Sequence, residues 1–134
     1  MLDHAGFLRT LALNVIARGI NSLDRAIGAI NDIIVYEDTQ YQLKDDIVKR
    51  ADERINGLRI KMRKLNDTIR SEANNKQGPD NSKIVQARNE IYGSTNDVIL
   101  ELTKFINHFD EYIKRPELTR AILIELKELA RKFR

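Results

Sequence analysis

The sequence contains no cysteine, no tryptophan and only two prolines among its 134 residues. Without cysteine the chain can form no disulfide framework, thiolate metal site or thiol nucleophile, which excludes several classes of enzyme. Its longest apolar runs, Ile33 to Tyr36 and Ala121 to Ile124, are four residues long, whereas a membrane-spanning helix needs about 18. The first residues lack the basic start and apolar stretch of a secretory signal. We therefore expect an unprocessed, intracellular protein without a transmembrane segment.

Charge of one sign is in only small excess. The chain carries 23 basic and 20 acidic residues, a formal net charge of +3, which permits a polyanionic partner without requiring one. Hydrophobic residues make up 42% and charged residues 32%, too apolar a mixture for a disordered chain and too charged for a membrane protein. The length is that of one ordinary domain with one core. We expect residues 1–134 to form a single domain.

Three polar segments divide the chain into regions of helical periodicity. The clearest is the run at 74–82, which contains Gly78-Pro79, and the others lie at 37–39 and 114–117. Pro116 suits the first turn of a helix, where its missing N–H would have had no partner. The expected helices span about 3–36, 40–73, 82–115 and 116–134.

Apolar residues recur at spacings of three and four in these regions, which gives a seven-residue repeat. The repeat comprises Leu13, Ile16, Ile20, Leu23, Ile27, Ile30 and Ile34 in the first region, and Tyr41, Val48, Ala51, Ile55, Leu58, Met62, Leu65 and Ile69 in the second. The inner faces of the last two comprise Ile84, Ile91, Val98, Leu102, Phe105, Phe109 and Tyr112, then Leu118, Ile122, Leu126, Leu129 and Phe133. With short connections, this pattern predicts an all-α, antiparallel up-and-down four-helix bundle with heptad-type packing at about 20°.

The third helix contains Gly93-Ser94-Thr95-Asn96 where its apolar face is interrupted. Glycine costs about 1 kcal/mol relative to alanine in a helix interior. We expect one helix that is kinked near 93–96. The alternative is a break, with Ser94 or Thr95 capping a restarted helix.

No constellation in the sequence is typical of catalysis or metal binding. A di-iron bundle needs Glu-x-x-His pairs, but the residue three before His108 is Phe105, and His4 has only Met1 at that offset. Methionine can be an axial ligand of haem iron, so Met62 is a candidate, yet a methionine on a helix seam more often fills the core. Nucleotide-binding and hydrolase motifs are also missing. We expect a non-enzymatic protein with no cofactor, no metal and no catalytic residue.

One basic segment carries a chemical asymmetry. Between residues 49 and 64 the sequence has seven basic residues against two acidic ones. Such a cluster can contact phosphates of double-stranded DNA without reading its sequence. The candidate contact residues are Arg59, Lys61, Arg63 and Lys64. The alternative is a solvated face that supports solubility and local ion pairs.

Extra apolar surface is expected on the first and last helices. A stripe of small residues accompanies the first seam and would let another backbone approach closely, while the last helix has apolar residues beyond one face. The candidate assembly surface comprises Ala12, Gly19, Ala26, Ala29, Leu123 and Ile124. Such residues would pack against copies of the chain, or else lie buried inside one bundle.

In overall character the sequence resembles the small helical-bundle coat proteins of large spindle-shaped archaeal viruses. The features that carry this resemblance are the repeats from Leu13 to Ile34 and from Tyr41 to Ile69, together with the polar loop from Asn74 to Ser82. The resemblance implies a major capsid subunit, present in many copies in a virion shell around DNA. Two functions therefore remain in view: a self-assembling structural protein, and a small nucleic-acid-binding or regulatory protein that uses the basic half of the second helix.

Overall fold

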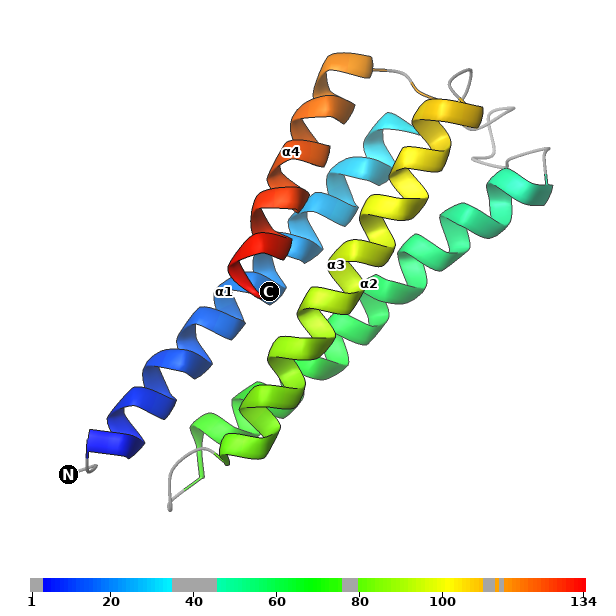
Figure 1. Ribbon diagram of the computed structural model, residues 1–134. Helices are drawn as coiled ribbons and strands as arrows, with labels where there is room; N and C mark the ends of the chain where they lie inside the picture. The colour runs from blue at the N-terminus through cyan, green and yellow to red at the C-terminus, as the bar shows by residue number, and fades with distance from the viewer. Residues whose placement is uncertain (1–3, 35–45, 76–79, 110–112, 114) are drawn as a thin grey trace.

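The computed structural model describes residues 4–34, 46–75, 80–109, 113 and 115–134 of the chain. The described residues form four helices: α1 (His4–Ile33), α2 (Asp46–Ala73), α3 (Asn81–His108) and α4 (Pro116–Lys132). Consecutive helices run in opposite directions along one common axis (Figure 1). The expected all-α, up-and-down four-helix bundle is confirmed.

The cross-section of the bundle is not a square. Helices α1 and α3 contact each other and both remaining helices, whereas α2 and α4 do not meet within the part of the chain that the structure describes. The pair α1 and α3 therefore forms the centre of the bundle. Helix α2 lies on one side of this pair and α4 on the other (Figure 1).

Most core residues belong to the predicted apolar seams. All seven residues of the first seam, Leu13 to Ile34, are buried, and α2, α3 and α4 contribute Ile55, Met62, Val98, Leu102, Phe105 and Leu126, all at 0% exposure. Leu58 and Phe109 are only partly buried. Leu118 is 38% exposed and so is not the inner-face residue that its spacing predicted. Tyr41 and Tyr112 lie outside the described residues.

Helix α3 ends at His108, seven residues before the expected boundary at 115. The N–H of Phe109 still donates to the carbonyl oxygen of Phe105 at 3.1 Å, but Phe109 itself has a φ of −132° and leaves the helix. Ile113 then pairs with Ile34 in an isolated antiparallel bridge. Arg115, which directly precedes Pro116, has a φ of −133° and a ψ of 85°, outside the helical region, as expected for the residue before a proline.

The helix passes through Gly93 without a break, because α3 is one element from Asn81 to His108. Gly93 is exposed, and a Cβ atom built on it would meet nothing within 4 Å. Thr95, which interrupts the apolar spacing, is nevertheless buried. The glycine is therefore tolerated on the outer side of an uninterrupted helix.

Helix α4 covers only half of the central pair. It has 17 residues against 30 in α1, and its C-terminal end lies about midway along α1 (Figure 1). There the ring of Phe133 lies against Gly19, where a Cβ atom would be 2.5 Å from the ring carbon Cζ. Arg88 of α3 lies over the same ring and donates to the carbonyl oxygen of Lys132 at 3.2 Å. These contacts fix the point at which α4 ends.

Candidate functional site

The ionisable residues do not converge on a metal or catalytic cluster within the described ranges. No three His, Asp or Glu side chains there are arranged to hold a metal ion. His108 is exposed at the end of α3, with its ring centroid 6.4 Å from that of Phe109. Met62 is completely buried among apolar side chains of the core. None of the helices that the structure describes is long and apolar enough to cross a membrane.

Part of the basic segment of α2 is engaged within the fold. The Nε atom of Arg59 donates to Oδ1 of Asp24 on α1 at 2.7 Å. This hydrogen bond raises the pKa of the Arg59 guanidinium above its ordinary value. Because both side chains are about one-third exposed, the pair holds α2 against α1 at the surface. The Arg59 guanidinium is therefore already paired with a carboxylate of the bundle.

The remaining three predicted contacts lie on two sides of α2. Lys61 and Lys64 line a groove of about 310 Å³ between α2 and α3, which also holds Lys83 and Glu90. Arg63 instead lines a groove of about 220 Å³ between α2 and α1, beside Asp24. The structure thus brings Lys61 and Lys64 together, but it does not place all four residues in one patch.

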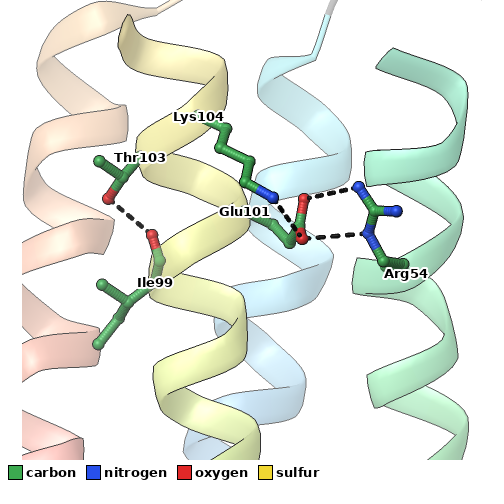
Figure 2. A network of polar contacts seen from close by, with 5 residues as sticks. All are labelled: Arg54, Ile99, Glu101, Thr103 and Lys104. Atoms are coloured by element: carbon green, nitrogen blue, oxygen red, sulfur yellow. Dashed lines mark hydrogen bonds and ion pairs between the residues drawn. The ribbon is translucent and has the colours of Figure 1, made fainter. Parts of the chain in front are cut away.

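Another residue of the basic segment, Arg54, binds a buried carboxylate on α3. Its Nε and Nη2 atoms donate to the two carboxylate oxygens of Glu101 at 3.1 and 3.4 Å (Figure 2). Lys104 donates to the same carboxylate at 3.4 Å. The Glu101 side chain is only 8% exposed, and two cations compensate its charge, which would be costly to leave unpaired. This network joins α2 to α3.

The α2–α3 connection is clamped by a second carboxylate. The buried carboxylate of Glu72 accepts a hydrogen bond from the backbone N–H of Asp80 at 2.9 Å and forms an ion pair with Lys83 at 3.0 Å. The Asp80 bond, followed by the Lys83 bond, lowers the pKa of Glu72, and Glu72 in turn raises the pKa of Lys83. Asp80 caps α3 by accepting from Ser82, whose hydroxyl and N–H lower the pKa of Asp80. These polar contacts are structural.

The predicted assembly residues have different environments. Gly19 and Ala26 are buried, and Ala12 and Ala29 are partly buried. Within the bundle, Phe133 covers Gly19, and Ala26 and Ala29 line a groove of about 710 Å³ between α1 and α4. On α4, Leu123 packs partly against the core, whereas Ile124 is 62% exposed. Of the six, Ile124 is therefore the large side chain that is free for another molecule.

The structure adds three apolar residues that the sequence reasoning missed, Phe7, Leu8 and Leu11, beside Val15, which belongs to the stripe of mostly small residues on the first helix. Phe7, Leu8, Leu11 and Val15 of α1 are 54%, 50%, 45% and 49% exposed, and they are named here the N-terminal stripe. At 100° per residue the four side chains lie within about 100° of one another on the helix. The signal was present in the sequence, because these positions continue the spacing of the small residues Gly19, Ser22 and Ala26. The missing information was that α4 stops before reaching them.

A second basic groove lies between α3 and α4. Its volume is about 510 Å³, and its lining includes the exposed Tyr92 together with Lys127, Arg131 and Arg134. Glu128 also lines this groove and forms an ion pair with Arg131. Positive charge is therefore distributed over two grooves of the bundle, each of which contains a glutamate.

Comparison of the chain with known proteins finds no matching protein-family model, no matching curated protein and no matching solved structure.

Proposed function

We propose that this protein is a non-enzymatic structural protein that assembles with copies of itself through exposed apolar helix faces. The observation that carries the proposal is the N-terminal stripe, four large apolar side chains that share one helix face and are each about half exposed. A contiguous exposed apolar patch on a protein surface often marks an interaction site. Ile124 on α4 supplies further exposed apolar area.

The finer form of the proposal is a coat subunit of a virion, present in many copies around DNA, as the resemblance of the sequence implies. An extended shell needs at least two different contacts per subunit, since a single self-complementary contact closes at a dimer. The N-terminal stripe and the surface around Ile124 lie on different helices and would serve as two such contacts.

The experiment is the mass of the purified protein in solution, measured by light scattering and sedimentation over a wide concentration range. We expect the mass to rise with concentration, and to rise equally when Lys61, Arg63 and Lys64 are changed to Glu. Those three side chains are exposed, so their replacement leaves apolar contacts intact. A protein that remains monomeric at the highest concentration would refute self-assembly.

The second candidate function is nucleic-acid binding through the basic half of α2. Two observations favour it: Lys61 and Lys64 lie together in one groove, and Lys83 of α3 lines the same groove. Against it, Arg59 lies on the α1 side of α2 and is paired with Asp24, and within the groove Lys83 is paired with Glu72. The groove would therefore offer few free cations to a phosphate backbone, and we rank this function below self-assembly.

A further inference from the structure

The groove between α3 and α4 differs from the other basic groove because it contains an exposed aromatic side chain. Tyr92, which lines the α3 side of this groove, is 37% exposed. Of the phenylalanine and tyrosine side chains that the structure describes, the other exposed one is Phe7, which lies on α1 in the N-terminal stripe. The described residues that line the groove between α2 and α3 include no aromatic residue. Tyr92 is therefore an exposed ring beside a set of cations.

The α4 side of the groove supplies these cations. Lys127, Arg131 and Arg134 follow one another at spacings of four and three, which places them along one side of α4 and its C-terminal end. At 1.5 Å per residue the three positions extend over about 10 Å, a length comparable to two or three phosphates of one nucleic-acid strand. The side chains of Lys127 and Arg134 form no hydrogen bond or ion pair within the described part of the chain.

The acidic residue in the lining is Glu128, and its charge is directed to one cation. Glu128 forms an ion pair with Arg131, three positions further along α4, and both side chains are more than half exposed. An exposed pair of this kind contributes little to stability, so a phosphate group can replace Glu128 at Arg131. The lining therefore carries a net positive charge that is available to an anionic ligand.

Arg88 of α3 fixes the position of the cations relative to Tyr92. Its Nη2 atom donates to the carbonyl oxygens of Lys132 and Arg134 at 3.2 and 3.4 Å, and its guanidinium lies 5.8 Å from the centre of the Phe133 ring. Arg88 and Tyr92 are one helical turn apart on the same side of α3. The end of α4 is thereby held beside the exposed ring.

We propose that the α3–α4 groove binds single-stranded nucleic acid, with an unpaired base stacked on Tyr92 and the neighbouring phosphates on Lys127 and Arg134. The apolar residues Ile99 and Ala130 line the same groove, so it also suits the apolar face of a base. The bases of a duplex are stacked on one another and present only their edges, so a duplex does not gain the contact with Tyr92. This site adds a ligand to the proposed self-assembly and does not depend on it.

The chemistry of the groove predicts binding that is tolerant of sequence. Every base has a π-face that can stack on an aromatic ring, and contacts to phosphates read no sequence. The groove has a volume of about 510 Å³, in the range of sites for small organic ligands, so one copy of the protein holds only a short piece of the strand. We therefore expect weak binding by each copy and strong dependence on salt.

Fluorescence anisotropy with a labelled 12-nucleotide oligothymidylate tests the stacking contact. We expect the natural sequence to bind this strand more tightly than a duplex of the same length. Tyr92→Ala should weaken binding of the strand by about 10-fold, whereas Tyr92→Phe, which keeps the ring, should change it by less than about 3-fold. The matched control is Leu100→Ala, which truncates an apolar side chain of α3 that is 55% exposed outside the groove. Far-UV circular dichroism verifies that the variants fold.

A salt titration tests the phosphate contacts. Changing Lys127 and Arg134 to Gln should lower the slope of log affinity against log salt by about 1.4, since each phosphate contact of a single strand contributes about 0.7. The control changes Lys49 and Arg50 to Gln, two exposed cations of α2, which does not meet α4 within the described residues.

Three outcomes would overturn the inference. If Tyr92→Ala binds the oligothymidylate as tightly as the natural sequence, no base stacks on the ring and the groove is only a basic surface. If the duplex binds as tightly as the single strand, the groove does not select unpaired bases. If thymidine monophosphate competes as effectively as the 12-nucleotide strand, the ligand is a free nucleotide and not a strand.

Discussion

Two hydroxyl side chains lie side by side in the middle of α3, at Ser94 and Thr95. Both are buried, and neither Oγ of Ser94 nor Oγ1 of Thr95 has a hydrogen-bond partner among the described residues. Thr119 of α4 is equally buried, but its Oγ1 donates to the carbonyl oxygen of Arg115 at 2.8 Å. The same residue type thus occurs in two buried environments that differ in hydrogen bonding.

This contrast predicts opposite effects of the same substitution. Thr95→Val removes a buried hydroxyl that has no partner and should raise the free energy of unfolding by about 1 kcal/mol. Thr119→Val removes a satisfied hydroxyl and should lower it by about 1 kcal/mol. Urea unfolding followed by circular dichroism measures both variants. Equal losses of stability in the two variants would contradict this assignment.

At the scale of helices, ion pairs join α2 to its neighbours. The one at the α2–α3 connection joins Glu72 to Lys83, and Glu72 also accepts the backbone N–H of Asp80; these contacts are called the clamp. The pKa of Glu72 is lowered first by the Asp80 N–H and then by Lys83. A carboxyl whose pKa is lowered in the folded state contributes stability above its unfolded pKa, and this contribution is lost as the pH falls through the folded value. The clamp therefore contributes at neutral pH and is lost in acid.

We predict that Glu72→Gln reduces stability at pH 7, and that the difference from the natural sequence narrows as the pH falls below about 4.5, the ordinary glutamate pKa. Lys83→Gln is the matched comparison. This variant keeps the hydrogen bond from the Asp80 N–H, which is the largest cause of the lowered Glu72 pKa. Its free energy of unfolding should therefore retain most of its dependence on pH. Thermal melts of the three proteins between pH 7 and pH 3 measure this effect. If the melting temperatures of Glu72→Gln and the natural sequence differ by the same amount at every pH in that range, the ionisation of Glu72 is not coupled to folding.

At the scale of the whole molecule, the difference in helix length produces the distinctive surface. Because α4 has 17 residues and α1 has 30, the bundle has four helices at one end and three at the other. If copies of the chain associate through a two-fold contact at the three-helix end, that contact closes at a dimer. Assembly beyond the dimer would therefore need a second contact, for which the exposed Ile124 is available.

The charged grooves provide the test of the alternative function. If the α2–α3 groove binds duplex DNA, changing Lys61 and Lys64 to Glu should reduce affinity and lower the slope of log affinity against log salt by about 2, because two phosphate contacts are lost. The melting temperature should change little, since both side chains are exposed. Changing Lys127 and Arg131 to Glu in the α3–α4 groove is the matched control. If filter binding detects no loss for the Lys61 and Lys64 variant, this groove is not a nucleic-acid site.

Several features of the fold could be predicted from the sequence because they depend on local spacing. The seam from Leu13 to Ile34 is buried as predicted, and α4 begins at Pro116. The end of α3 could not be predicted in the same way. Phe109 and Tyr112 continue the apolar spacing, but the helix ends at His108 and Ile113 pairs instead with Ile34, far away in the chain.

The candidate surfaces depended more strongly on tertiary structure. The sequence by itself determined which residues are basic, which are small and which share a helix face, because those properties follow from composition and from 3.6 residues per turn. Only the tertiary structure decided that Arg59 pairs with Asp24, 35 positions away, and that Phe133 covers Gly19 while Leu11 remains exposed. The physical reason is that ion pairing and burial depend on where two distant helices lie beside each other, and helical periodicity within one segment does not contain that information.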